Sequence, residues 1–291
     1  MASTARPLLP PRVVVIVLTW NGRDLTLACL ESLRSARATG VEIVVVDNGS
    51  SDGTASAIRE RHGERVTIIE NAANLGFSAG NNVGIAYALR RGARFLLLLN
   101  NDTAVDPDFI EELVRPLEQD PHIGITGPKI YYYTPRDRIW FAGGEVRMAR
   151  GLARHVGIRE TDHGQYDVPR EVDYVTGCAL MARREVYEEV GLLDPSYAAY
   201  FEDTDLCIRA GRAGYSLLYV PTAKVWHKIS ASTGGQLSRR KMARKLRSGA
   251  RFFSRYARPY HWLTIPLFFA ADGLRVAALV ATGRIRDATN E

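Results

Sequence analysis

Three polar stretches follow apolar runs in the first third of the chain, and two of them carry a carboxylate. They are Thr19-Trp20-Asn21, Asp47-Asn48-Gly49 and Asn100-Asn101-Asp102. If the apolar runs form parallel strands, ligands bind beyond their carboxyl ends, so these residues are the first candidates for a site. A nucleoside diphosphate needs a partner for its base and a cation for its phosphates, and these side chains offer both.

The two carboxylates suit different parts of such a ligand. Asp102 closes the apolar run LLLLNNDT, and one carboxylate shared with substrate phosphates suits a hard divalent cation. The other interpretation of Asp102 is a turn residue. Asp47, in VVVDNGSSDGT, is placed to accept a hydrogen bond from the imide N–H of a pyrimidine. Alternatively Asp47 forms an Asx-turn or a helix N-cap, a role that Asp52 fits better.

A second group of acids lies in the stretch YFEDTDLCIRAGRAGY. Because successive helical residues rotate by about 100°, Glu202, Asp203 and Asp205 cannot all point one way. Asp205 has Arg209 four residues further on, which is a favourable spacing for a helical ion pair, so Asp205 is the structural member. Asp203 or Glu202 then remains for proton transfer, which needs an unpaired carboxylate near an acceptor hydroxyl.

His227, in KVWHKISAST, follows a strand-like stretch. It is placed either to complete the coordination of a metal or to meet a phosphate. The competing interpretation is a structural histidine.

Strand-like and helical stretches alternate through the first half of the chain, which predicts an α/β fold with a mostly parallel sheet covered on both faces. The expected strands are 13–19, 42–47, 66–70, 95–99 and 123–127, and the expected helices are 25–35, 55–61, 82–91 and 107–119. Asp106 and Pro107 form a good N-cap and first-turn pair for the last of these helices.

The second half is predicted in less regular pieces. Residues 134–169 lack periodicity and are expected to form a β-hairpin or loops near an acceptor site. Two helices and two strands are expected after them, at 174–182 (strand), 184–190 (helix), 203–213 (helix) and 216–220 (strand). From residue 238 a basic helix follows, with an apolar stripe predicted at Met242, Leu246, Gly249 or Ala250, and Phe253.

Composition bounds the class of protein. The 291 residues have ordinary globular composition, and three scattered cysteines suggest neither a disulfide framework nor a metal cluster. The N-terminus lacks the pattern of a secretory signal, so we expect the catalytic part to be cytoplasmic.

The net charge of +6 hides a strong asymmetry. No Asp or Glu lies between Asp205 and Asp272, where thirteen Lys or Arg occur, and the rest of the chain is acidic on balance. Such a segment favours an anionic partner, namely a membrane surface, a lipid diphosphate or nucleic acid, or else it is a solvated basic helix. Polar interruptions in the apolar run 263–281 favour an interfacial helix pair over a membrane span.

The order of motifs resembles family-2 glycosyltransferases of the GT-A fold, closest to a bacterial rhamnosyltransferase-like branch. The resemblance covers residues 13 to 232 and rests on TWNG, VVDNGSSDGT, NLGFSAGNN, LLLLNNDT, FEDTD and the later WH. It implies that Asp47 contacts the nucleobase, Asp102 binds Mg²⁺ or Mn²⁺, Asp203 is the catalytic base and His227 is a metal or diphosphate ligand. The implied donor pocket is lined by Thr19, Asn21, Asn74, Gly76, Asn81 and Asn101.

One position departs from the family pattern. The usual Asp-X-Asp metal motif is Asn100-Asn101-Asp102 here, so a single carboxylate remains and the metal is expected to bind together with the donor's diphosphate.

The resemblance therefore predicts an inverting, metal-assisted transferase that takes its sugar from dTDP-rhamnose or a UDP-sugar. The expected acceptor is a glycan or a polyprenyl-diphosphate-linked sugar at the inner face of the cell membrane, with peripheral contact to anionic lipid and no nucleic-acid partner. Homo-oligomerisation is left open.

The expected division is a disordered segment 1–12, a GT-A catalytic domain 13–236 and basic C-terminal helices 237–291. Within the catalytic domain, the donor half covers about 13–130 and the acceptor half about 131–236. The alternatives are a sugar-phosphate nucleotidyltransferase, whose Gly-rich, Arg-containing loop is missing at TWNGRD, and a non-catalytic carbohydrate-binding module.

Overall fold

The computed structural model describes residues 10–197, 199–228, 239–268 and 270. Most of the N-terminal segment 1–12 and of the run 263–281 therefore lies outside the described residues. Within the described part of the chain, no helix is long and apolar enough to cross a membrane.

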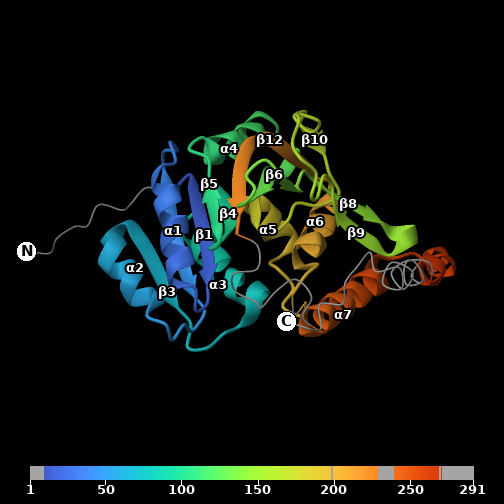
Figure 1. The fold of residues 1–291 in the computed structure, drawn as a ribbon, viewed down its shortest axis with the longest axis horizontal. Helices are drawn as coiled ribbons and strands as arrows, with labels where there is room; N and C mark the ends of the chain where they lie inside the picture. The colour runs from blue at the N-terminus through green and yellow to red at the C-terminus, as the bar shows by residue number, and fades with distance from the viewer. Residues whose placement is uncertain (1–9, 198, 229–238, 269, 271–291) are drawn as a thin grey trace, which may run out of the picture.

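Four parallel strands form the N-terminal half of the main sheet (Figure 1). They are β1 (Val13–Thr19), β2 (Val41–Asp47), β3 (Val66–Glu70) and β4 (Phe95–Asn100), in the order β3-β2-β1-β4. Near-continuous runs of Val, Ile and Leu form these strands because both faces of the sheet are covered. The prediction of a parallel sheet is confirmed for this half.

The sheet continues beyond β4 as a mixed sheet. Strand β11 (Ala179–Arg183) runs antiparallel between β4 and β6 (Ile123–Tyr132), and β12 (Ser216–His227) is parallel to β6. Short strands complete it: β5 (Thr103–Val105), β7 (Ile139–Phe141) and β10 (Arg170–Glu171). The predicted strand at 174–182 is wrong in its first half, since pairing begins only at Ala179, and the strand predicted at 216–220 continues to His227.

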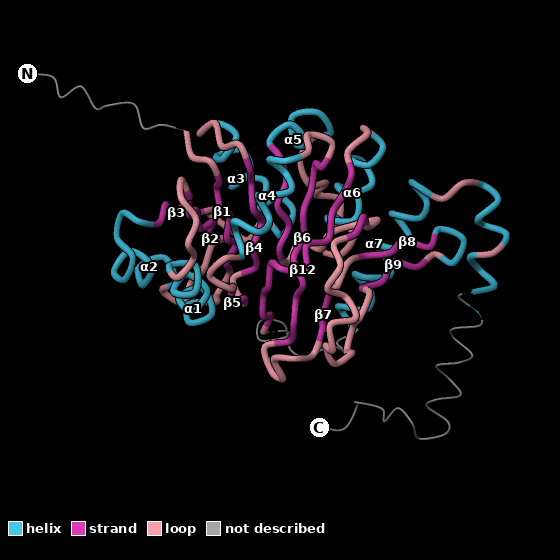
Figure 2. The backbone as a smooth tube through the Cα atoms, turned by 90° about the horizontal axis from the view of Figure 1, so that it is seen from above, coloured by secondary structure: helices cyan, strands magenta, loops and turns pink. Residues whose placement is uncertain are grey.

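Helices cover both faces of the sheet (Figure 2), as predicted. Helices α1 (Arg23–Arg34) and α2 (Thr54–His62) lie on one side, and α3 (Gly76–Arg90), α5 (Arg184–Val190) and α6 (Glu202–Arg212) lie on the other. Helix α4 (Phe109–Gln119) packs on β6 and β12. It begins at Phe109 with Asp108 at the N-cap position, so the predicted start at 107 and N-cap at Asp106 are wrong; Asp106 Oδ1 instead accepts from the N–H of Asp108 in the turn before the helix.

Helix α3 begins six residues earlier than predicted, at Gly76. Two glycines of α3, Gly80 within NLGFSAGNN and Gly84 just after it, let the helix approach the sheet closely. A Cβ on Gly84 would lie 2.4 Å from Ile16 Cγ2, and one on Gly80 would lie 2.6 Å from Leu18 Cδ1. Close packing therefore outweighs the low helix propensity of glycine here.

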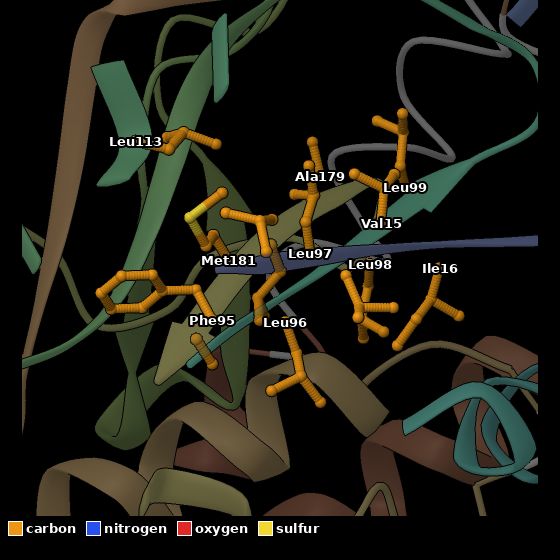
Figure 3. Packing of buried hydrophobic residues seen from close by; sticks show 14 of the residues in the cluster. Val15, Ile16, Phe95, Leu96, Leu97, Leu98, Leu99, Leu113, Ala179 and Met181 are labelled. Atoms are coloured by element: carbon orange, nitrogen blue, oxygen red, sulfur yellow. The ribbon is translucent and has the colours of Figure 1, made fainter. Parts of the chain in front are cut away.

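The core is centred on the neighbouring strands β4 and β11, between the helical layers (Figure 3). Strand β4 contributes the fully or nearly fully buried Phe95, Leu96, Leu97, Leu98 and Leu99. Figure 3 shows Met181 and Ala179 of the neighbouring β11 in contact with this row.

The expected hairpin in 134–169 is present as β8 (Gly144–Arg147) and β9 (Leu152–His155). Short 3-10 turns η1 (Gly63–Arg65), η2 (Met148–Arg150) and η3 (Pro259–Leu263) complete the described elements. Helix α7 (Arg239–Tyr256) runs beside α6 and the hairpin (Figure 1).

The predicted apolar stripe of α7 is only partly correct. Phe253 is buried, but Leu246 is 56% exposed, and the side chain of Met242 lies outside the described residues. The face that contacts the domain consists of Ser248, Gly249, Phe252, Phe253 and Tyr256.

Candidate active site

The carboxyl ends of three adjacent parallel strands bring the predicted polar residues to one edge of the sheet. Thr19 of β1 is paired in register with Asp47 of β2, and Leu18 with Asn100 of β4. Thr19 and Asp47 are both buried. The structure thus gathers residues from positions far apart in the chain, as the strand order requires.

The loops after β1 and β2 are tied to each other. Asn21 has a left-handed backbone (φ 48°), its Oδ1 accepts from the N–H of Ser51 at 2.8 Å, and its own N–H donates to Ser50 Oγ. Asp47 Oδ1 accepts from the N–H of Ser50 at 3.0 Å, so Asp47 does form a turn bond. Asp52 accepts from the N–H of Thr54, which is the Asx-type role predicted for it.

Asn48, a strand-end candidate for which no role was predicted, joins β2 to the segment before α3. Its Oδ1 accepts from Asn71 Nδ2 and from the N–H of Leu75, and its Nδ2 donates to Asn74 Oδ1. Asn74 Oδ1 also accepts from the N–H of Gly76, which has a left-handed φ of 81°. Asn74 and Gly76 are therefore held at the edge by Asn48, and the adjacent Asp47-Asn48 pair was the available sequence signal.

Two other predicted donor residues are engaged within the protein. Asn101 Nδ2 donates to Thr19 Oγ1 at 3.2 Å and to Thr26 Oγ1 at 3.0 Å, which fixes the loop after β4 against β1 and α1. Asn81 is buried and donates from Nδ2 to the carbonyl oxygen of Phe77 within α3. A direct contact of either side chain with a donor remains a prediction.

Asp102 and His227 lie side by side although 125 residues separate them. Strand β12 pairs with β5, with His227 opposite Thr103, and this places His227 Nε2 3.0 Å from Asp102 Oδ1. Burial alone lowers the pKa of His227, but the neighbouring Cys178 and Asp102 outweigh it and raise that pKa to about 10. The sequence could not show this pairing, because it depends on strand contacts between distant segments.

The pair fits a divalent cation. Asp102 Oδ1 and His227 Nε2 face each other in a buried position, and Asp102 Oδ1 has no other polar partner among the described residues. Carboxylate oxygen and imidazole nitrogen both ligate Mn²⁺, and a Mg²⁺ or Mn²⁺ ion that shares substrate phosphates needs only one or two protein ligands. The described residues hold no cluster of three or more His, Cys, Asp or Glu that could bind a metal.

Asp203 lies in the first turn of α6, in contact with the segment Gly177-Cys178. Its Oδ2 accepts from the N–H of Gly177 at 2.8 Å, and its Oδ1 accepts from the N–H of Thr204. The carbonyl of Cys178 accepts from the N–H of Asn100, so this short segment links Asp203 to the strand end that carries Asp102. Burial raises the pKa of Asp203, which makes its carboxylate a stronger base.

The other two acids of α6 have different surroundings, as the helical rotation predicts. Asp205 is fully buried and accepts from Arg209 Nε at 2.8 Å, which is the predicted ion pair. Glu202 is buried with Oε2 lacking a partner among the described residues, and burial raises its pKa to about 8.

An aromatic side chain that the sequence analysis missed borders the metal pair. Trp140 contacts His227 edge-on, with ring centroids 4.7 Å apart, and it contacts His155 in the same way at 4.5 Å. Trp140 is half-buried, so it forms a wall beside His227 that no local sequence pattern indicated.

This fold is shared with solved nucleotide-sugar enzymes. The structure of GalNAc-T7 with UDP, GalNAc and Mn²⁺ matches with a TM-score of 0.62 and 20% identity, over 78% of this chain and 44% of that chain. A Pyrobaculum calidifontis mannosyltransferase with GDP-Man and Mn²⁺ matches with a TM-score of 0.58 and 20% identity, over 96% and 81%. These two matches show that the chain has the GT-A fold.

The family follows from the sequence itself. The model described as Glycosyl transferase family 2 matches residues 14–191, and the chain belongs to that family. Rhamnosyltransferases are among its relatives, as the predicted branch requires.

The N-acetylglucosaminyl-diphospho-decaprenol L-rhamnosyltransferase of Mycobacterium tuberculosis is 29% identical over 76% of this chain and 77% of its own length. The dTDP-rhamnosyl transferase RfbF of Shigella flexneri is 24% identical over 75% and 69%. The uncharacterised protein y4gI of Sinorhizobium fredii is 33% identical over 80% of this chain, which spans about a quarter (26%) of that longer protein.

Proposed function

We propose that this glycosyltransferase moves a sugar from a nucleotide-diphosphate donor to an acceptor hydroxyl with inversion, by direct displacement. The observation that carries the proposal is that the segment Gly177-Cys178 connects Asp203 to the strand end that carries Asp102, which pairs with His227. A cation-binding pair and a proton-accepting carboxylate are the two functions that this reaction requires.

The donor would lie across the strand ends. Asp47 is the proposed partner of the nucleobase, and Thr19, Asn21, Asn74 and Gly76 line the proposed pocket. Their side chains and turns are fixed by bonds within the protein, so the donor meets a largely preformed edge. The rhamnosyltransferase names among the relatives support dTDP-rhamnose as the donor, with a UDP-sugar as the alternative.

Asp203 is the proposed base. It takes the proton of the acceptor hydroxyl while the oxygen forms its bond to the anomeric carbon and the bond from that carbon to the diphosphate oxygen breaks. The N–H groups of Gly177 and Thr204 hold both carboxylate oxygens of Asp203 in place during this step. No covalent bond between enzyme and sugar is needed.

Asp102 and His227 are the residues that would hold Mg²⁺ or Mn²⁺. A cation there stabilises the charge that develops on the departing nucleoside diphosphate. Cys178 and Asp102 raise the pKa of His227, so ligation of a cation through its imidazole nitrogen would require the loss of a proton that these neighbours favour.

The proposed acceptor is a polyprenyl-diphosphate-linked sugar at the inner face of the cell membrane. The Mycobacterium tuberculosis relative is named for such an acceptor. The stretch between Asp205 and Asp272, which contains no acidic residue, suits an anionic surface.

The test is donor binding and slow donor hydrolysis across UDP- and dTDP-sugars, with Mn²⁺, with Mg²⁺ and with EDTA. One donor bound and hydrolysed only with metal supports the proposal and names the sugar. The variant Asp203→Asn should lose turnover and keep donor affinity, and full turnover in that variant would refute its role as base. If no nucleotide sugar binds under any condition, the donor site at Asp47 and Asp102 is wrong.

A further inference from the structure

Two strained residues lie two and three positions before the proposed base, Asp203. Tyr200 and Phe201 have left-handed backbones, with φ of 70° and 71°, and α6 begins at the next residue, Glu202. Bulky residues rarely adopt this conformation, and they do so only where the surroundings hold them. The direction in which Asp203 leaves the turn depends on this pair.

The C-terminal helix provides one of the contacts that hold the turn. Ser248 of α7 is buried and donates from Oγ to the carbonyl oxygen of Ala199 at 2.8 Å. This bond joins two segments 49 residues apart, and its acceptor is the peptide group directly before Tyr200.

Aromatic packing holds the second strained residue. The ring of Phe201 lies 5.1 Å from that of Phe252 and 5.9 Å from that of Phe253, measured between centroids. Gly249 leaves room for this contact, because a Cβ there would lie 3.3 Å from Phe201 Cε2. Helix α7 therefore contacts the turn through the hydroxyl of Ser248 and through the aromatic rings of Phe252 and Phe253.

The same helix also holds the end of the first turn of α6. Asp205, two residues after Asp203, accepts from Tyr256 Oη at 2.6 Å and from Arg255 Nη1 at 3.2 Å. Asp203 thus lies between two points that α7 fixes, Ala199-Phe201 before it and Asp205 after it.

We propose that Ser248 and Tyr256 of α7 are positioning residues for catalysis: they lock the strained turn and the start of α6 so that Asp203 faces the attacking hydroxyl. This inference rests on the proposed role of Asp203. It gives the basic C-terminal helix a function within the active site, separate from any surface that it contacts.

The test is dTDP-rhamnose hydrolysis, in which water takes the place of the acceptor, with dTDP affinity measured by calorimetry. Ser248→Ala removes the hydroxyl that holds the turn, and Tyr256→Phe removes the hydroxyl that holds Asp205 of α6. Because a small misplacement of a catalytic group is costly, we expect kcat to fall by about 10-fold or more in each variant while dTDP affinity stays within about 2-fold. Ser248→Thr, which keeps the hydroxyl, should recover most of kcat.

The matched control is Ser254→Ala, on the same helix. Ser254 is exposed and its Oγ donates to the carbonyl of Arg251 within α7, so its loss should leave kcat unchanged. Wild-type kcat in both Ser248→Ala and Tyr256→Phe, with Asp203→Asn inactive, overturns the positioning role alone. Wild-type kcat in Asp203→Asn instead overturns the proposed base. A loss of kcat in Ser254→Ala equal to that in Ser248→Ala also contradicts the inference, since it would show a general sensitivity of α7.

Discussion

At the scale of single residues, the most informative contact is the one between Asp102 and His227. Two ionisable groups 3.0 Å apart are buried, and Asp102 Oδ1 has no polar partner besides His227 Nε2 among the described residues. A buried carboxylate oxygen with a single partner keeps the capacity to accept a further ligand. A cation held with the donor's diphosphate accounts for this arrangement.

This leads to a prediction for Asp102→Asn. The variant loses the only carboxylate of the Asn100-Asn101-Asp102 motif, so we expect Mn²⁺-dependent dTDP binding to weaken by about 10- to 100-fold. Calorimetric titration of dTDP with and without Mn²⁺ measures it. Glu64→Gln, which alters an exposed carboxylate in η1 at the amino end of β3, is the control. Unchanged metal dependence in Asp102→Asn would assign the cation to other residues.

Glu202 provides a prediction about stability and pH. Burial raises its pKa from 4.5 to about 8, so between these values the folded protein keeps a proton that the unfolded chain has lost. The free energy of unfolding should therefore fall by up to about 1.4 kcal/mol per pH unit from pH 4.5 to about 8 relative to Glu202→Gln, which cannot ionise.

Urea unfolding of the wild type and of Glu202→Gln across this pH range measures the difference. Glu60→Gln, which removes an exposed carboxylate from α2, controls for the loss of one charge. A constant difference between wild type and Glu202→Gln at all pH values would show that Glu202 is not held protonated.

At the scale of secondary-structure elements, helix α3 shows how packing decides a boundary. Its glycines are close to the sheet, and Gly84→Ala would bring a methyl group within 2.4 Å of Ile16 Cγ2. We expect a loss of about 1–3 kcal/mol in the free energy of unfolding, because an overpacked core must shift its backbone. Thermal or urea unfolding measures this loss.

The matched control is Gly211→Ala in α6, where a Cβ would meet nothing within 4 Å. Alanine there should stabilise the protein by about 0.5–1 kcal/mol, since it restricts the unfolded chain without a clash. Equal effects of the two substitutions would mean that helix propensity, and not the contact with β1, determines the cost at Gly84.

The sequence predicted the strands and helices whose periodicity is local, and it failed where distant contacts decide. Strand β1 and helix α5 have the predicted bounds because their apolar patterns suffice. The start of α3 was missed because its glycines serve packing against β1, and the end of β12 was missed because pairing with β5 and β6 extends it.

The candidate site divides in the same way. Strand ends such as Asp47 and Asp102 are visible in the sequence, because a polar residue after an apolar run is a local signal. The role of Asn48 was not predicted and Trp140 was missed, since the bonds of Asn48 and the ring contact of Trp140 reach segments 23 or more and 87 residues away. The structure also distinguishes the two acids by their partners. Asp205 pairs with Arg209, as the helical spacing predicted, whereas Asp203 accepts from the backbone N–H of Gly177.

At the scale of the whole molecule, charge and exposed apolar residues gather at the C-terminal end of the described chain. Arg247 and Arg251 of α7 are exposed, and Trp262, Leu263 and Leu267 are 44%, 75% and 68% exposed. Arginines beside exposed Trp and Leu suit the interface of an anionic bilayer. Because the opposite face of α7 packs on Phe201 and α6, deleting the helix would damage the domain as well as the surface.

Charge reversal tests the membrane contact without removing that packing. We expect the wild type to float with vesicles that contain anionic phosphatidylglycerol and to stay behind with neutral phosphatidylcholine vesicles. Arg247→Glu combined with Arg251→Glu should abolish most flotation, because each basic residue near such a surface contributes about 1 kcal/mol and reversal also adds repulsion. The control is Arg61→Glu combined with Arg65→Glu. These exposed residues lie in α2 and η1, and their reversal makes the same change in net charge on another face. Equal flotation of both double variants would show that net charge alone, and not the surface of α7, determines binding to the vesicles.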